Sequence, residues 1–249
     1  MDCGRFVGAS GRTPIAQARV RPRRTRLVKV KTKRNVLVID VGGTNIKVVD
    51  CHHGEPIVIP SGPTMTARGM VTAVRKATTG WRYDVVSIGY PGPVVGDYPS
   101  AEPHHLGGGW TRLDFMKAFR CPIRIVNDAS MQAMGNYEGG RMLYLGFGTD
   151  FGSALIIEGV LGPMELADLP YRYGRTYGDV VGARGLKRLG VAEWRRHVAT
   201  VTSLFRDALQ AEYVVLGGGN SMLITNLPRG TRHGAKDGAY LGGLRLWSG

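Results

Sequence analysis

The stretch Val36-Leu-Val-Ile-Asp-Val-Gly-Gly-Thr-Asn-Ile-Lys-Val-Val-Asp50 decides the fold of this chain. Aliphatic and β-branched residues at 36–39 predict a strand that is buried on both faces. Gly42 and Gly43 end that strand, because glycine accepts backbone angles that turn the chain sharply. A second apolar run follows at 46–49. The segment is therefore expected to be a β-hairpin with glycines at its turn.

A glycine turn of this kind also suits a phosphate, because no Cβ lies between its backbone N–H groups and a ligand. Asp40 places a carboxylate beside the turn, as a metal ion would require. An ordinary β-turn would show the same glycines, so the hairpin alone leaves both interpretations open. Two familiar phosphate loops are excluded: the chain has no G-x-x-x-x-G-K-[ST] motif, and these glycines precede a strand rather than a helix.

Size and composition are those of a globular protein. The chain has 249 residues, 43% of them hydrophobic, which is enough for one large domain or two lobes. No apolar run approaches the length of a membrane span, so no membrane partner is expected. The three cysteines are scattered without a C-x-x-C pair. We therefore expect neither a disulfide framework nor a cysteine zinc site, and a cytoplasmic location is the default.

The positive charge is concentrated near the N-terminus. Residues 1–34 hold 11 of the 33 lysines and arginines and one of the 19 acidic residues, which leaves 22 basic and 18 acidic side chains elsewhere. Because this segment has no apolar periodicity, we expect a basic, disordered tail outside the folded part. A polyanion-binding arm, a transit peptide and an upstream start codon are the open alternatives.

The remaining chain alternates short apolar runs with amphipathic segments, as α/β proteins do. The expected strands are residues 55–60, 85–89, 123–126, 142–145, 153–158 and 213–216. The expected helices are residues 66–79, 111–119, 128–137, 194–209 and 238–246, with Leu113, Met116, Phe119 and Leu204 among their inward-facing residues. A second glycine turn, Gly146-Phe-Gly-Thr-Asp-Phe-Gly152, joins two of these strands and lies about 106 residues after the first.

This weak internal repeat predicts two similar α/β lobes that face each other across a cleft. We expect an N-terminal lobe at residues 35–118 and a C-terminal lobe at residues 119–235. A closing helix at about 236–249 is expected to pack back on the N-terminal lobe. A cleft between two glycine turns is a natural site for a phosphate chain.

Five short motifs occur in an order shared by one family of enzymes. They are Asp40-Val-Gly-Gly-Thr44, Val126-Asn-Asp-Ala129, Leu145-Gly-Phe-Gly-Thr149, Glu165-Leu-Ala-Asp-Leu-Pro170 and Val215-Leu-Gly-Gly-Gly219. Across residues 35–249 the chain thereby resembles the ROK sugar kinases, and among them the polyphosphate/ATP glucokinases most. The resemblance implies an α/β chain with the actin-like ATPase (ribonuclease H-like) fold, two α/β lobes around a cleft.

The resemblance also implies a reaction, the transfer of a phosphoryl group from ATP or inorganic polyphosphate to the 6-hydroxyl of glucose. Asp128 matches the catalytic base of the family, and the N-terminus of its helix is expected to favour the ionised carboxylate. Asn127 and Glu165 match residues that hold sugar hydroxyls. Asp40 matches the residue that organises the cofactor Mg²⁺ near the phosphates.

The two glycine turns match the phosphate loops of the family. The phosphate-binding residues that this implies are Gly42, Gly43, Thr44, Lys47, Gly148, Thr149, Gly152 and Gly218. Donor choice stays open between ATP and polyphosphate. The short segment between Leu186 and Leu209 leaves little room for an adenosine pocket, which favours polyphosphate, as does the basic charge.

Four departures from the family pattern surround the sugar and the second loop. Phe147 and Asp150 occupy positions where the family has Thr and Gly, and an added carboxylate repels phosphate unless a metal or lysine offsets it. Asp168 replaces the histidine of a Glu-x-Gly-His motif. His105 stands where a sugar-binding asparagine is usual. We expect Asp168 and His105 to contact the substrate in an altered pocket.

These departures leave two alternatives to a glucokinase. One is a kinase for another hexose or a polyol, and the other is a catalytically inactive ROK-like sugar-binding protein. The resemblance implies a homodimer with a small-molecule sugar as substrate. Nucleic acid is not an expected partner, because residues 1–34 are too short and too aperiodic for a helix-turn-helix.

Overall fold

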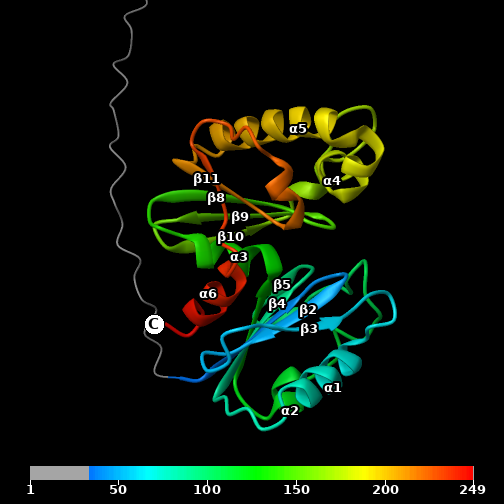
Figure 1. Cartoon of the computed structure of the whole chain (residues 1–249), viewed down its shortest axis with the longest axis vertical. Coiled ribbons are helices and arrows are strands. Elements are labelled where there is room, and N and C mark those ends of the chain that lie inside the picture. Colours follow the sequence, from blue (N-terminus) through cyan, green and yellow to red (C-terminus); the bar gives the residue numbers. More distant parts are fainter. Residues whose placement is uncertain (1–33, 249) are drawn as a thin grey trace, which may run out of the picture.

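The structure is a computed structural model that describes residues 34–248. The basic tail expected at residues 1–34 therefore lies outside the described residues, apart from Arg34. Two five-stranded sheets organise the fold, with strand orders β3-β2-β1-β4-β7 and β10-β9-β8-β11-β12. Each sheet belongs to one lobe, and the two lobes lie one above the other in Figure 1.

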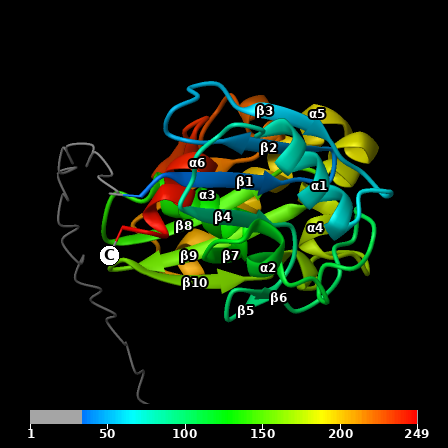
Figure 2. The same cartoon turned by 90° about the horizontal axis from the view of Figure 1, so that it is seen from below.

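The N-terminal sheet grows from the glycine-turned hairpin. Strands β1 (Val36–Val41), β2 (Asn45–Val49) and β3 (Ile57–Pro60) pair antiparallel. Strands β4 (Val85–Tyr90) and β7 (Ile123–Asn127) then continue the sheet parallel to β1. All residues of β1 but one are buried, as its unbroken apolar run predicts. Figure 2 shows these strands side by side.

The C-terminal sheet repeats this topology. Strands β8 (Arg141–Phe147), β9 (Phe151–Ile157) and β10 (Val160–Met164) form the antiparallel half. Strands β11 (Tyr213–Gly217) and β12 (Thr231–His233) add the parallel half. The internal repeat predicted from two glycine turns is therefore confirmed as two sheets with one strand order.

Helices form three layers around the two sheets. The outer layer of the N-terminal lobe holds α1 (Ala67–Ala77) and α2 (Phe115–Phe119), and that of the C-terminal lobe holds α4 (Tyr177–Val181) and α5 (Ala183–Ala208). Helices α3 (Asp128–Asn136) and α6 (Gly238–Arg245) lie between the sheets (Figure 1). Separate apolar clusters fill the spaces between these layers.

The middle layer is held together by close backbone contact. A Cβ at Gly242 of α6 would lie 1.7 Å from the carbonyl oxygen of Met131 on α3, and a Cβ at Gly135 would lie 1.8 Å from that of Gly238. Only glycine allows the two helices to approach this closely. Ser87 of β4 donates a hydrogen bond of 2.7 Å to the carbonyl of Gly243, which ties α6 to the N-terminal sheet.

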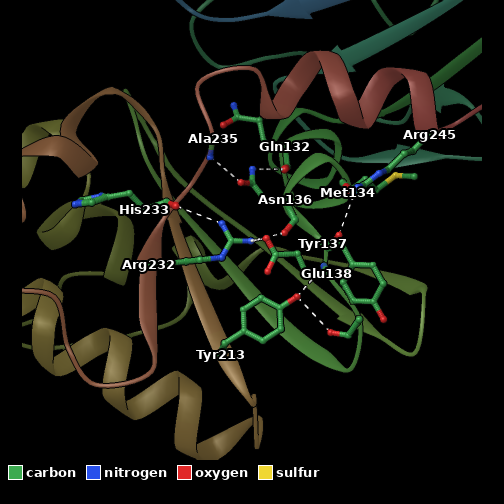
Figure 3. A network of polar contacts seen from close by, with 11 residues as sticks. Gln132, Met134, Asn136, Tyr137, Glu138, Tyr213, Arg232, His233, Ala235 and Arg245 are labelled. Carbon is green, nitrogen blue, oxygen red and sulfur yellow. Dashed lines mark hydrogen bonds and ion pairs between the residues drawn. The ribbon is translucent and has the colours of Figure 1, made fainter. Parts of the chain in front are cut away.

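Polar side chains complete this junction at the C-terminal end of α3 (Figure 3). Arg232 of β12 donates to the carbonyl of Asn136 at 2.6 Å and pairs with Glu138 at 3.1 Å. Arg245 of α6 donates to the carbonyl of Tyr137 at 3.0 Å. The last carbonyls of a helix have no partner within it, so these arginines satisfy them and also match the helix dipole.

Several details differ from the sequence prediction. Strand β7 pairs with β4 in the N-terminal sheet, so this sheet extends past the boundary expected at residue 118. Helix α2 begins only at Phe115, because Asp114 caps it by accepting a hydrogen bond of 2.9 Å from the N–H of Lys117. Before it, the carboxylate of Glu102 holds the backbone N–H groups of Trp110 and Thr111 in a loop. Met116, on this short helix, is 50% exposed, and Leu204 on α5 is 47% exposed. The prediction that both face inward was therefore wrong.

Within residues 34–248, five α-helices and β-strands were not predicted from the sequence. They are β5 (Val94–Val95), β6 (Tyr98–Pro99), β10, β12 and α4, each of only two to five residues. Helix α5 begins before the predicted residue 194, but Gly190 inside it has a φ of 74°, which breaks the helix there. The predicted amphipathic segment coincides with the regular part of α5 beyond this break. Short elements carry too few residues for a periodic pattern to be read.

Candidate active site

The first hairpin sets a carboxylate beside a lysine. Asp40 on β1 lies directly opposite Lys47 on β2, so that both side chains point to the same face of the sheet. Burial raises the pKa of Asp40 to about 6, while the charge of Lys47 lowers it. Thr44 at the turn is exposed, and the carbonyl of Gly42 accepts a hydrogen bond of 2.7 Å from Ser61. The turn is thus anchored from one side and open on the other.

Asp128 is the first residue of α3 and follows the last residue of β7. Its carboxylate accepts a hydrogen bond of 2.7 Å from the backbone N–H of Ala129. The second hairpin reaches this point because β9 has a glycine there, Gly152, whose Cβ would lie 2.7 Å from that of Ala129. Asp128 therefore lies where the N-terminal sheet, the middle helix layer and the second hairpin meet.

Burial dominates the electrostatics of Asp128. The pKa of the carboxyl group is raised to about 7, first by burial and then by the negative charge of Asp40. Glu165 and Asp150 contribute in the same direction, while the hydrogen bond from Ala129 lowers the pKa. The sequence argument expected the helix N-terminus to favour the ionised form. That argument was wrong in sign, because desolvation and three nearby carboxylates outweigh the helix.

Asn127 has a structural role at the start of α3. Its side-chain oxygen accepts a hydrogen bond of 3.2 Å from the N–H of Ser130, which makes Asn127 the N-cap of the helix. Its amide nitrogen donates to the carbonyl of Gly92 at 3.3 Å. These contacts hold the end of β7 and the start of α3 in position, and thereby fix the backbone from which Asp128 projects.

Glu165 interacts with two charged or polar neighbours, Asp168 and His104. Glu165 has a raised pKa, caused first by burial and then by the charge of Asp168, while His104 lowers it. Asp168 lies one 3₁₀ turn further along the chain and is exposed. Glu165 and Asp168 are thus brought together, and the nearby His104 offsets part of their negative charge.

The second glycine turn resolves one of the departures. The side chain of Phe147 is fully buried, packs edge-on against Trp194 at 5.8 Å and stacks on Phe151 at 5.5 Å. It fills the core beneath α5 and does not face the phosphate side of the turn. The backbone at Gly148 and Thr149 remains exposed or partly exposed, as a phosphate loop requires.

The same turn is supported from behind by a residue that the sequence reading missed. Asn220 donates a hydrogen bond of 3.2 Å to the carbonyl of Gly148. Gly218, one of the expected phosphate contacts, packs against the backbone of Phe147, where a Cβ would lie within 2.7 Å of three atoms. The signal for Asn220 was its place directly after the run of three glycines that ends β11.

His105 lies between the two turns. A Cβ at Gly43 would be 3.2 Å from the Cβ of His105, so the histidine covers the first turn. Its Nε2 atom is 3.2 Å from Oδ1 and 3.0 Å from Oδ2 of Asp150 in the second turn. Asp150, recognised in the sequence only as an unfavourable charge, therefore has a partner from the opposite lobe.

The donor set around Asp40 suits a magnesium ion that arrives with a phosphate donor. Mg²⁺ usually keeps several waters and binds one or two carboxylates together with substrate phosphates. Within residues 34–248, no group of three or more His, Cys, Asp or Glu side chains is placed to hold a metal ion by itself. Asp40 would therefore supply the protein's share of the coordination, with the phosphates supplying the rest.

The chain was compared with family models, curated protein sequences and solved structures. No family model and no curated protein sequence matches the chain. Solved structures do: an inorganic polyphosphate/ATP-glucomannokinase from Arthrobacter sp. strain KM superposes with a TM-score of 0.73 at 20% identity, over 86% of this chain and 98% of that one. The chain has the fold of the ROK sugar kinases. The predicted actin-like, two-lobed architecture is thereby confirmed.

Two further structures give the same result. A ROK family glucokinase from Streptomyces griseus, in complex with glucose and AMPPNP, has a TM-score of 0.65 at 16% identity and covers 85% of this chain and 98% of that one. A ROK hexokinase from Thermus thermophilus has a TM-score of 0.62 at 19% identity, over 85% and 97%. At these identities the likeness concerns the fold. Among the described helices, none is both long and apolar enough to cross a bilayer.

Proposed function

We propose that this ROK-fold chain is a sugar kinase that transfers a phosphoryl group from ATP or inorganic polyphosphate to the 6-hydroxyl of glucose. The observation that carries the proposal is the position of Asp128 between the two glycine turns, with a pKa of about 7. A general base works best when its pKa is near the operating pH. Both turns then lie on the donor side, and Glu165 with Asp168 on the sugar side.

The reaction needs positioning, charge neutralisation and a proton acceptor. In the proposed mechanism, ionised Asp128 accepts the proton of the sugar hydroxyl as the hydroxyl oxygen attacks the terminal phosphorus. The bond from that phosphorus to the bridging oxygen breaks, and ADP or the shortened polyphosphate leaves with the electron pair. Backbone N–H groups of the two turns, at Gly43 and Thr149, orient the phosphates. Asp40 and Lys47 stand at the first turn, where Mg²⁺ brought by the donor supplies positive charge. Glu165 accepts hydrogen bonds from sugar hydroxyls.

An activity panel tests this proposal. The full chain is incubated with glucose, mannose, N-acetylated hexoses and polyols, each with ATP-Mg²⁺ and with polyphosphate-Mg²⁺, and sugar phosphate is measured. We expect glucose 6-phosphate with at least one donor. Asp128→Asn should lower kcat by roughly 10²–10⁴-fold, the range for removal of a general base, with little change in sugar affinity. An Asp128→Asn enzyme with unchanged kcat would exclude this residue as the base.

A kinase for another hexose or polyol is the second candidate. It is favoured by Asp168, an exposed carboxylate beside Glu165 where the family pattern has a histidine. Two acidic side chains can accept hydrogen bonds from two hydroxyls, but neither can donate one to an acetamido oxygen. Turnover confined to a sugar other than glucose would support this candidate. Absence of turnover across the panel would leave the inactive sugar-binding protein.

A polyphosphate donor is favoured by the close packing of the core behind the second turn. The aromatic side chains there pack on each other, and Phe147 and Trp194 are fully buried. A homodimer and a cytoplasmic location remain part of the proposal and follow from the resemblance alone. Gel filtration with light scattering tests the first, and the donor panel separates polyphosphate from ATP.

A further inference from the structure

The contact between His105 and Asp150 joins the two lobes at the cleft. His105 comes from the loop between β6 (Tyr98–Pro99) and α2, and Asp150 comes from the turn between β8 and β9. The Nε2 atom reaches both carboxylate oxygens, at 3.2 Å and 3.0 Å. Because His105 also covers Gly43, the pair touches both glycine turns at once. A phosphate chain that used both turns would have to meet this pair.

Asp150 is an unusual group for such a position. Its charge raises the pKa of both Asp128 and Glu165, so it adds to a field that repels phosphate. Within residues 34–248, no lysine or arginine forms an ion pair with it, and His105 is its partner. A carboxylate and a phosphoryl group can each accept a hydrogen bond from the N–H of His105, because both carry anionic oxygens.

From this geometry we infer that His105 is a ligand of the donor phosphate, and that Asp150 occupies its N–H until a donor phosphate displaces it. This inference rests on the proposed function and changes one part of it, because it moves His105 from the sugar to the donor. The side chains of the pair are 41% and 53% exposed. Exposed pairs shift an equilibrium by about fivefold at most, so a phosphate chain held by both turns can displace the carboxylate.

The pair would then act as a filter for donors. A single phosphate ion gains one contact with His105 and loses the one with Asp150. A polyphosphate or nucleotide tail gains contacts with the backbone of both turns, which exceeds the cost of separating the pair. Asp150 therefore lowers the affinity for both ligands by the same factor, and only a chain of phosphates makes enough other contacts to bind tightly despite it.

The test uses calorimetric binding of inorganic tripolyphosphate to the full chain, with Mg²⁺ present, and the KM values for donor and sugar. Asp150→Asn keeps the shape of the side chain and should tighten tripolyphosphate binding about threefold to fivefold. His105→Asn should weaken it and raise the KM for the donor, while the KM for the sugar stays unchanged. In the double variant, Asp150→Asn should not tighten binding relative to His105→Asn alone, because the N–H of His105, for which Asp150 and phosphate compete, is gone.

A matched control is available on the outer helix α5. Glu193 lies 3.7 Å from the ring of His197, a histidine–carboxylate pair away from the cleft. Glu193→Gln should leave tripolyphosphate binding unchanged. If it changes as much as Asp150→Asn, the effect is one of overall charge and the inference fails.

Other results would also overturn the inference. Equal tightening by Asp150→Asn with and without His105 would mean simple repulsion, and weaker binding would mean that Asp150 assists the donor or its metal. A rise confined to the KM for the sugar in His105→Asn would return that residue to the sugar site. If the enzyme phosphorylates a sugar but all variants bind tripolyphosphate equally, only the inference about His105 and Asp150 is rejected. If the variants bind as expected but no sugar is phosphorylated, only the kinase proposal is rejected.

Discussion

Replacement of Asp128 by asparagine should stabilise the chain while it removes activity. The structure raises the pKa of this carboxyl group from 3.8 to about 7, mainly by burial. The native state therefore holds a proton that the unfolded chain releases, and the free energy of unfolding falls as pH rises from 3.8 to about 7. Asparagine has nearly the same shape and no charge, so it escapes this cost.

The size of the effect follows from the shift. One pKa unit corresponds to about 1.4 kcal/mol, and a shift of about three units to about 4 kcal/mol at pH 8. Water that reaches the carboxylate from the cleft lowers this figure, so we expect a gain of about 2–4 kcal/mol. Near pH 4 the gain should shrink to roughly 0.5 kcal/mol, because Asp128 is then neutral in the native state and only about half ionised in the unfolded state.

Urea unfolding of Asp128→Asn and wild type, measured between pH 4 and pH 8, gives the difference directly. Glu193→Gln on α5 serves as the control for loss of one carboxylate and should show no such pH dependence. A difference in stability that is constant across this pH range would refute the assignment of a raised pKa to Asp128. So would a variant that is less stable than wild type at pH 8.

Three further changes test other parts of the structure. Asp40→Asn should move the acidic limb of the pH profile of kcat/KM to lower pH, because Asp40 is the largest contributor after burial to the raised pKa of Asp128; a limb that moves to higher pH would contradict this. Gly242→Ala should lower the free energy of unfolding by roughly 2 kcal/mol or more, because its Cβ would meet the carbonyl of Met131, whereas Gly54→Ala, with open space around it, should change little in the same urea assay. Glu165→Gln should raise the KM for the sugar and leave that for the donor unchanged; the reverse result would place Glu165 on the donor side.

Local pattern was enough to predict the elements around the site. The apolar run and glycine pair of β1 and β2 form the predicted hairpin, and the second hairpin lies at the predicted residues. Strand periodicity, glycine turns and helix caps depend on neighbours within a few residues, so they can be read directly. The same locality explains why Asp128 could be placed at a strand–helix junction.

The environment of each site residue was decided by contacts between distant segments. Burial and the charges of Asp40, Asp150 and Glu165 outweigh the helix N-terminus at Asp128. Phe147 points into the core because Trp194 lies behind it. Neither fact has a local signature, since each depends on which segments the fold brings together.

The amino-acid sequence by itself determined that this chain has two glycine-turned hairpins in repeated α/β halves. It also placed the carboxylate of Asp128 at the end of the strand that comes before the second hairpin. Only the tertiary structure decided that β7 completes the first sheet, that His105 meets Asp150 across the cleft, and that Asp128 has a pKa near neutrality. The physical reason is one of range. Backbone geometry is set by adjacent residues, whereas desolvation and Coulomb interactions sum over groups that are tens of residues apart in the chain.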